Sequence, residues 1–387
     1  MHPTAAGPVV HDRWVRSPGT RSSTASRVSR DVGVFEAIGA DHHERVVVGH
    51  DPATGLRAII AIYSTDLGPA LGGTRLFPYP DDDAALVDAL RLSKGMAFKA
   101  AASGLDLGGG KAVIIGDRSM ITDDLWRAYG RFVDSLAGAY ITAEDVGTTT
   151  DDMHVIAEET KWVVGRAADD HGAGDPSPAT ARGVVRAMQA VASHLHGSDS
   201  LSGARIAVQG VGKVGSALVE FLVEEGAEVV IADIKQEAAD ALVERFGVKA
   251  VAKDDILLEE CDILSPCSLG ASLRVDTIPN LRCRAVVGSA NNQLATDEDD
   301  NRIADAGIIY VPDFVANAGG LIHVSAELDE FNAKLVSRRI SGIYDAVLSI
   351  LSQAAADNLT PNEAAVRFAE DRIRREGNGV TFRHGGQ

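Results

Sequence analysis

The 387-residue sequence predicts an α/β protein with two domains, the second of which is built on a doubly wound parallel sheet. Beyond residue 200, short β-branched strands alternate with amphipathic helices, an order typical of parallel sheets. A glycine-rich turn joins the first of these strands to its helix. Residues 172–178, Gly-Ala-Gly-Asp-Pro-Ser-Pro, are rich in helix and strand breakers and separate this unit from an earlier α/β region.

The predicted domains are residues 32–172, an N-terminal α/β domain, and residues 173–344, the domain with the parallel sheet. Residues 345–387 are expected to form helices that return to the N-terminal domain, followed by a tail. Residues 1–31 carry arginines among Ser, Thr, Pro and Gly with little apolar content, so we expect a disordered N-terminal tail.

Composition excludes several classes of partner. The 55 acidic residues outnumber the 37 basic ones and give a net charge of −18, which disfavours nucleic acid and anionic membranes. No uncharged apolar stretch approaches the roughly 18 residues that span a bilayer. The three cysteines, Cys261, Cys267 and Cys283, fit no metal-site spacing and predict unpaired thiols in a reducing cytoplasm. No metal site is predicted.

The elements of the N-terminal domain follow from apolar patterning. Residues 45–48 and 56–64 are predicted strands, the second buried on both faces. Residues 81–83, three aspartates, open a helix whose N-terminus favours negative charge. A further helix near residues 125–136 precedes a short strand, residues 139–143.

Two lysines twelve residues apart carry the strongest chemical signal in this domain. Lys99 lies near the end of the helix that opens at residue 81, and Lys111 follows the triplet Gly108-Gly-Gly110. We expect the triplet to form a turn that lets the backbone approach a small ligand, before a buried strand at residues 112–115. A phosphate-binding P-loop is excluded. That motif needs glycine at position 105 and Ser or Thr at position 112, but the chain has Leu105 and Ala112 there.

The second domain contains a complete dinucleotide fingerprint. A strand at residues 204–209 leads into Gly210-Val-Gly-Lys-Val-Gly215 and an amphipathic helix that Gly226 ends. A second strand, residues 228–232, ends at Asp233. This order predicts a Rossmann-type domain in which Gly210 makes the turn, Gly212 admits the pyrophosphate and Gly215 allows helix and strand to pack. Asp233 would bind the adenosine ribose and repel a 2′-phosphate, which favours NAD over NADP, although Lys235 weakens that preference.

Six ordered motifs occur along residues 32–374. They are Leu67-Gly-Pro-Ala-Leu-Gly-Gly-Thr-Arg75, Lys94-Gly-Met-Ala-Phe-Lys99, Gly108-Gly-Gly-Lys111, Ala143-Glu-Asp-Val-Gly147, Gly288-Ser-Ala-Asn-Asn-Gln-Leu294 and Pro312-Asp-Phe-Val-Ala-Asn-Ala-Gly-Gly320. With these motifs the chain resembles the amino-acid dehydrogenase family, which comprises the Glu, Leu, Phe and Val dehydrogenases, and within it the leucine and valine branch.

The resemblance implies reversible oxidative deamination of an L-amino acid to its 2-oxo acid and ammonium, with NAD accepting the hydride. It implies that Lys99 holds the substrate carboxylate, Lys111 activates water and Asp145 shuttles protons at the substrate nitrogen. Two lysines in one cleft repel each other's charge, so neutral Lys111 is expected to be accessible near neutral or mildly alkaline pH. The remaining implied ligands are Gly72 and Gly73 at the floor of the substrate site, Thr180 and Asn291 at the nicotinamide, and Lys213 and Val214 in the cofactor loop. The resemblance also implies a homo-oligomer.

The side-chain pocket decides the substrate. Leu71 occupies the position at which glutamate dehydrogenases carry a lysine, so a second substrate carboxylate would be left unpaired and the glutamate alternative is disfavoured. By resemblance Ala143, Leu321 and Val324 line the rest of the pocket. All four are apolar, and the bulk of Leu71 and Leu321 favours a branched-chain amino acid.

Two other functions stay open at this stage. A phenylalanine dehydrogenase of the same family is favoured by the local sequence of residues 314–320 and by His323 nearby. A non-catalytic NAD-binding regulator would be expected to have lost Lys99, Lys111 or Asp145, and none is lost.

Overall fold

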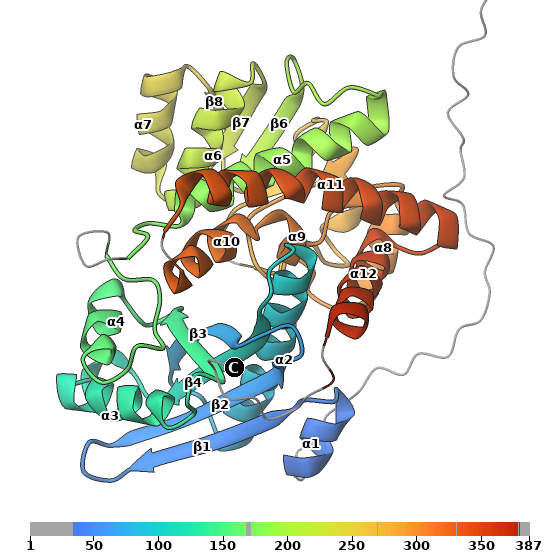
Figure 1. The fold of residues 1–387 in the computed structure, drawn as a ribbon. Coiled ribbons are helices and arrows are strands. Elements are labelled where there is room, and N and C mark those ends of the chain that lie inside the picture. Colours follow the sequence, from blue (N-terminus) through green and yellow to red (C-terminus); the bar gives the residue numbers. More distant parts are fainter. Residues whose placement is uncertain (1–33, 168–171, 269, 330, 378, 380–387) are drawn as a thin grey trace, which may run out of the picture.

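Two β-sheets in separate halves of the molecule define the architecture (Figure 1). The computed structural model describes residues 34–167, 172–268, 270–329, 331–377 and 379. The predicted tail at residues 1–31 lies outside the described residues. The mixed α/β class predicted from the sequence is confirmed, and the half formed by β1 to β5 with α1 to α4 is termed here the first-sheet domain.

The first-sheet domain has a five-stranded mixed sheet in the order β1-β2-β4-β3-β5. Alternating side chains of β2 and β4 pack on α2 from one face, through Ile59, Ala61 and Val113, and on α3 from the other, through Ile60 and Ile114. The sheet is therefore buried on both sides, as the apolar run at residues 56–64 predicts. The elements are α1 (Val34–Ala40), β1 (Arg45–Asp51), β2 (Leu56–Ser64), β3 (Ala70–Phe77), α2 (Asp82–Ala102), β4 (Gly108–Ile115), α3 (Asp123–Asp134), β5 (Tyr140–Glu144) and α4 (Thr150–Ala157).

The glycine triplet differs from its prediction. Gly108, Gly109 and Gly110 are not a turn before the strand but the first three residues of β4. A Cβ on Gly109 would lie 2.2 Å from the backbone nitrogen of Ala97 in α2, so the triplet serves a close helix-to-strand contact. The glycines thus bring α2, which carries Lys99, directly against the strand that carries Lys111.

The second-sheet domain, which begins at α5, has a six-stranded sheet in the order β11-β10-β9-β6-β7-β8. Every strand pair in it is parallel. The chain reverses its direction of winding between β6 and β9, which is where ligands bind in doubly wound sheets. Its elements are α5 (Ser177–His196), β6 (Arg205–Gln209), α6 (Lys213–Glu224), β7 (Glu228–Ala232), α7 (Gln236–Phe246), β8 (Lys249–Ala250), β9 (Ile263–Pro266), β10 (Ala285–Val286), α8 (Glu298–Asp305), β11 (Ile309–Tyr310), α9 (Asp313–Ala316) and α10 (Gly319–Ser325).

The last two helices connect the halves. Helix α11 (Ala333–Asp357) packs along α5, and α12 (Pro361–Glu376) packs on α2 of the first-sheet domain (Figure 1). Arg372 of α12 fixes this contact by donating to the Leu105 carbonyl at 2.7 Å and to the Asp106 carboxylate at 2.7 Å. The boundary predicted at residue 344 falls inside α11. No helix among the described residues is long and apolar enough to cross a membrane.

Candidate active site

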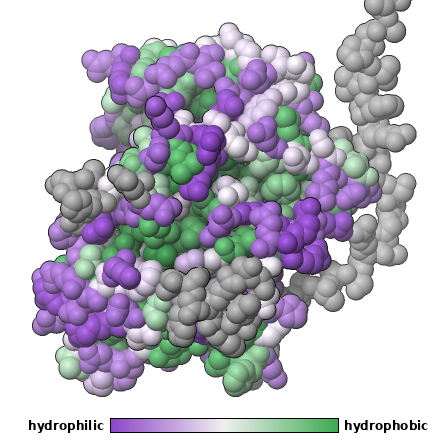
Figure 2. Space-filling view, viewed as in Figure 1, coloured by the Kyte–Doolittle hydropathy of each residue, from purple (hydrophilic) through white to green (hydrophobic). Residues whose placement is uncertain are grey.

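A cavity of about 620 Å³ lies between the two domains. Apolar residues gather along the boundary between the upper and lower halves of the molecule (Figure 2). Eleven of the residues predicted to be catalytic or to bind substrate or cofactor line the cavity together, and these are Leu71, Gly72, Gly73, Lys99, Lys111, Ala143, Asp145, Lys213, Asn291, Leu321 and Val324.

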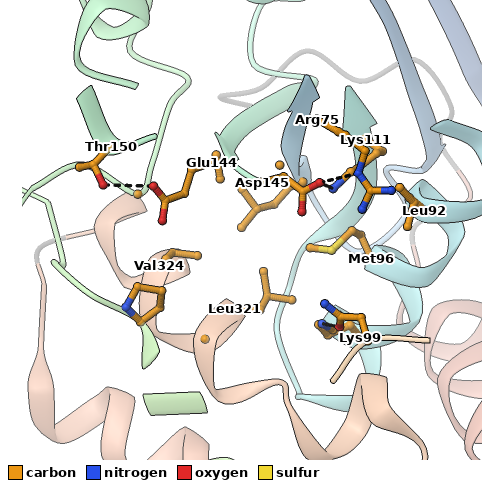
Figure 3. A pocket seen from close by; sticks show the side chains of 18 of the residues that line it. Arg75, Leu92, Met96, Lys99, Lys111, Glu144, Asp145, Thr150, Leu321 and Val324 are labelled. Carbon is orange, nitrogen blue, oxygen red and sulfur yellow. Dashed lines mark hydrogen bonds and ion pairs between the residues drawn. The ribbon is translucent and has the colours of Figure 1, made fainter. Parts of the chain in front are cut away.

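Lys111 and Asp145 form a buried ion pair at one end of the cavity (Figure 3). Lys111 Nζ lies 2.9 Å from Asp145 Oδ2, and the lysine comes from β4 whereas the aspartate follows β5. Burial lowers the pKa of Lys111, although the Asp145 charge opposes this shift, and Arg75 lowers it further. Burial is therefore the leading cause of the shift, ahead of the repulsion between cations that the sequence suggested. Burial alone would raise the pKa of Asp145, but Lys111 and Arg75 lower it and keep the carboxylate ionised.

Lys99 reaches the cavity from α2 and meets the second-sheet domain. Its Nζ donates to Asn291 Oδ1 at 3.4 Å, and the same oxygen accepts a hydrogen bond from Asn317 Nδ2 at 2.7 Å. Burial lowers the pKa of Lys99, whereas the nearby Asp313 carboxylate raises it. Asp313 accepts from the backbone nitrogen of Asn292. The ammonium group thus faces a space in which an anion could be bound between the two domains.

The glycine pair of β3 forms part of the cavity wall where side chains would not fit. A Cβ on Gly73 would lie 2.6 Å from the Glu144 carbonyl and 2.8 Å from Asp145 Cβ. Tyr140 donates from Oη to the Gly72 carbonyl at 2.6 Å and so fixes this stretch of backbone. The close approach lets β3 and β5 bring Asp145 beside Lys111.

The predicted side-chain pocket is largely apolar. Leu71, Ala143 and Leu321 are buried and line it, with Val324 half-buried beside them. The cavity also contains a charged side chain that the sequence did not reveal: Glu144 Oε2 accepts from Thr150 Oγ1 at 3.1 Å (Figure 3). His323, considered in the sequence as a mark of aromatic specificity, does not line this cavity and instead contacts the Ala173 carbonyl at 2.9 Å.

The fingerprint loop has the geometry of a dinucleotide site. Gly210 has φ +96°, and a Cβ on Gly215 would lie 2.1 Å from the Gly210 carbonyl. A Cβ on Gly212, by contrast, would meet nothing within 4 Å, so there is open space where the backbone precedes α6. No side chain caps the first N–H groups of that helix, which suits a phosphate.

Asp233 closes this loop from the end of β7. Its Oδ2 accepts from Val211 N at 2.7 Å and its Oδ1 from Lys235 N at 2.8 Å. Each carboxylate oxygen keeps a lone pair that could accept from a ribose hydroxyl. Val214 lies in the first turn of α6, and Thr180 lies in the first turns of α5, where its Oγ1 donates to the Pro176 carbonyl at 3.0 Å.

Sequence reasoning missed three charged groups next to the predicted catalytic residues. Arg75 pairs with Asp145 and Asp88, and the charge of Asp313 acts on Lys99, yet none of these three residues was assigned a role. Arg75 and Asp313 belong to two of the six motifs. A search of these motifs for residues of opposite charge to Asp145 and Lys99 could therefore have identified them. Asp88 carried no sequence signal, because its neighbour Arg75 is thirteen residues away on another element.

Comparisons with known proteins agree with this geometry. Residues 43–162 match the family model described as Glu/Leu/Phe/Val dehydrogenase, dimerisation domain. Residues 172–237 and 230–376 match the model described as Glutamate/Leucine/Phenylalanine/Valine dehydrogenase.

Individual relatives cover most of the chain. A leucine dehydrogenase from Bacillus cereus is 48% identical over 341 residues, which cover 88% of this chain and 93% of that protein. A valine dehydrogenase from Streptomyces coelicolor is 49% identical over 335 residues, which cover 86% of this chain and 92% of that protein. The crystal structure of an L-tryptophan dehydrogenase from Nostoc punctiforme superposes with a TM-score of 0.80 at 42% identity, over 88% of this chain and 99% of that one. The chain therefore belongs to the Glu/Leu/Phe/Val dehydrogenase family and is an amino-acid dehydrogenase.

Proposed function

We propose that this protein catalyses the reversible, NAD-dependent oxidative deamination of branched-chain L-amino acids. One observation carries the proposal: the buried Lys111, the half-buried Lys99 and an ionised aspartate share a cavity with the apolar side chains of Leu71 and Leu321. In this reaction the substrate α-carbon gives up a hydride, water adds to the resulting imine, and ammonium leaves as the 2-oxo acid forms.

Each charged residue has a role that follows from its surroundings. The Lys99 ammonium binds the substrate carboxylate, since its hydrogen-bond partner across the cavity is the Asn291 amide, which leaves its charge free to pair with an anion. Lys111, whose pKa burial lowers, acts in its neutral form as the base that activates water. Asp145 stays ionised 2.9 Å from Lys111 and exchanges protons with the substrate nitrogen.

The cofactor proposal is NAD, which when bound supplies the hydride acceptor. The open backbone at Gly212, the uncapped start of α6 and the Asp233 carboxylate fit a dinucleotide with a free ribose 2′-hydroxyl. Lys213 and Val214 would hold the phosphates, and Thr180 and Asn291 would orient the nicotinamide carboxamide. Ile234, apolar and 82% exposed directly after Asp233, is available to pack on the adenine ring.

The branched-chain preference rests on volume and charge. Leu71 and Leu321 narrow the pocket, and neither offers a charge to a second substrate carboxylate. A methylene in such a pocket is worth about 1–3 kcal/mol, so valine, leucine and isoleucine should differ modestly. An aromatic substrate is the second candidate, favoured by the 42% identity to a protein described as an L-tryptophan dehydrogenase.

A screen of the L-amino acids for NADH formation tests both candidates. We expect valine, leucine and isoleucine to give the highest kcat/KM, phenylalanine and tryptophan lower values, and glutamate no activity. A kcat/KM for an aromatic amino acid above that of every branched-chain one contradicts the preference. No NADH with any amino acid contradicts the reaction itself.

Two further features complete the proposal. The protein is a homo-oligomer whose subunits associate through the first-sheet domain, in keeping with the description of the family model that matches it. It works in the cytoplasm, where its three unpaired thiols would stay reduced.

A further inference from the structure

A row of alternating charges runs from Asp145 away from the cavity. Arg75 Nε and Lys111 Nζ both lie 2.9 Å from the same oxygen, Asp145 Oδ2. On its other side, Arg75 Nη1 lies 2.9 Å from Asp88 Oδ2. Asp145, Arg75 and Lys111 are drawn together in Figure 3, with dashed lines between the charged groups.

The far end of this row is held firmly. Asp88 Oδ2 also accepts from Tyr79 Oη at 2.6 Å, and its Oδ1 pairs with Arg91 Nη2 at 3.0 Å. Arg91 in turn donates to Asn292 Oδ1 of the second-sheet domain at 2.9 Å. The side chains of Arg75, Asp88 and Asp145 are only 20%, 17% and 24% exposed, so solvent screens these pairs weakly.

We propose that Arg75 is a positioning residue for the reaction: it holds the Asp145 carboxylate against Lys111, and Asp88 holds Arg75 in place. This inference rests on the proposed deamination, in which Asp145 and Lys111 carry the proton transfers. Arg75 lines the cavity as well, but its two ion pairs are with Asp145 and Asp88, so it acts on the reaction through Asp145. Its Nε and Nη1 point to different carboxylates, a fork that a lysine cannot reproduce.

The same contacts give Arg75 an electrostatic effect on both proton-transfer groups. Its positive charge lowers the pKa of Asp145 and that of Lys111. Loss of this charge therefore raises both pKa values, and a higher pH is needed before Lys111 is neutral. Four ionisable groups interact with Asp145, namely Lys111 from β4, Arg75 from β3, Lys99 from α2 and Tyr79 from the segment after β3, and Asp88 from α2 acts on Arg75 and Lys111.

The test compares the pH profile of kcat/KM for wild type and Arg75→Gln with the best amino acid and saturating NAD. We expect the acid limb of the variant's profile, which follows the pKa of Lys111, to move up by about 1 pH unit, because a nearby positive charge that disfavours the ammonium form is lost. At neutral pH kcat should fall by about tenfold, whereas NAD affinity should be unchanged. Arg75→Lys should keep the limb near its wild-type position with a smaller loss of kcat.

The variant Asp88→Asn distinguishes two effects of Asp88: its hold on Arg75 and the direct effect of its charge on Lys111. The Asp88 charge raises the pKa of Lys111, so its removal by itself would move the acid limb to lower pH. If Asp88 instead acts by fixing Arg75, the limb moves to higher pH, as in Arg75→Gln. A limb that moves to lower pH shows that Asp88 acts by its charge alone and overturns its anchoring role.

Arg118→Gln is the matched control. Arg118 also forms a double ion pair with an aspartate of the first-sheet domain, Asp152, at 2.6 and 2.9 Å, but it does not line the cavity. We expect a lower melting temperature without any displacement of the pH profile. If Arg75→Gln behaves in the same way, losing activity equally at every pH, Arg75 is merely structural and the inference fails. A wild type without activity on any amino acid would instead refute the proposed deamination.

Discussion

At the residue scale, we expect Lys111 and Lys99 to act on the amino acid and not on NAD, and substitutions can test this assignment. Lys111→Ala removes the proposed base, so kcat should fall by at least about a hundredfold. NAD affinity should stay within about twofold, since Lys111 lies on β4 and the cofactor loop lies in the other domain. Lys99→Ala should mainly raise the amino-acid KM, on the order of tenfold or more, through loss of a charged hydrogen bond.

Steady-state kinetics with varied amino acid, together with NAD titration by calorimetry, separate these effects. A large loss of NAD affinity in Lys111→Ala would mean that the residue has been assigned to the wrong ligand. An unchanged KM in Lys99→Ala would contradict its carboxylate role.

Asp233 is the residue that should set cofactor choice. Asp233→Ala and Asp233→Asn both remove the charge that repels a 2′-phosphate, so both should narrow the gap between NAD and NADP in kcat/KM. The asparagine variant keeps an acceptor for one of the two amides, Val211 N or Lys235 N, whereas alanine keeps none, so the asparagine variant should remain the more active with NAD. Asp240→Ala, whose carboxylate contacts only the neighbouring Gln236 among the described residues, is the control and should leave cofactor preference unchanged. A wild type that already prefers NADP refutes the role of Asp233.

Among elements, the contact between α2 and β4 sets the distance between the two lysines. A Cβ on Gly109 would lie 2.2 Å from Ala97 N and 2.4 Å from the Ser93 carbonyl, both backbone atoms that cannot move without shifting α2. Gly109→Ala should therefore lower the free energy of unfolding by about 3 kcal/mol. Urea denaturation measures this loss.

Gly342→Ala provides the comparison, since a Cβ there meets nothing within 4 Å in the exposed face of α11. It should stabilise the helix by up to about 1 kcal/mol. Equal stability of the two variants would show that α2 adjusts freely over β4.

The sequence predicted those elements whose signal is local. The strand at residues 56–64 and the strand, glycine loop and helix around Gly210 have periodicity and turn chemistry within one window, and β2, β6 and α6 occupy these stretches. The glycine triplet was misjudged because its reason is the backbone of α2, which only the folded chain brings near. The partnership of Arg75 with Asp88 depends likewise on the packing of β3 beside α2, which no spacing encodes.

At the scale of the whole molecule, an edge of the first sheet offers a surface to a partner. Strand β1 lies at the edge of the first sheet, and Val48 on it is 71% exposed. An exposed edge with an apolar side chain is a ready surface for pairing with another chain. We expect a native mass that is a multiple of 40.6 kDa, and a smaller assembly for Val48→Lys.

Light scattering after size exclusion measures both quantities. Val275→Lys, which changes a valine of similar exposure in the second-sheet domain, should keep the wild-type mass. A monomeric wild type, or equal masses for the two variants, would contradict association through this edge.

The return of α12 to α2 has a mechanical consequence. The chain connects the two domains twice. The first connection leads from residue 167 to α5, and the second leads from α11 to α12. Two bodies joined at two places turn most freely about the line through those joints, whereas sliding or twisting strains one of them. We therefore expect the cavity to open by rotation about this line. Because α12 packs on the helix that carries Lys99, the C-terminal helix also fixes where this lysine lies during that rotation.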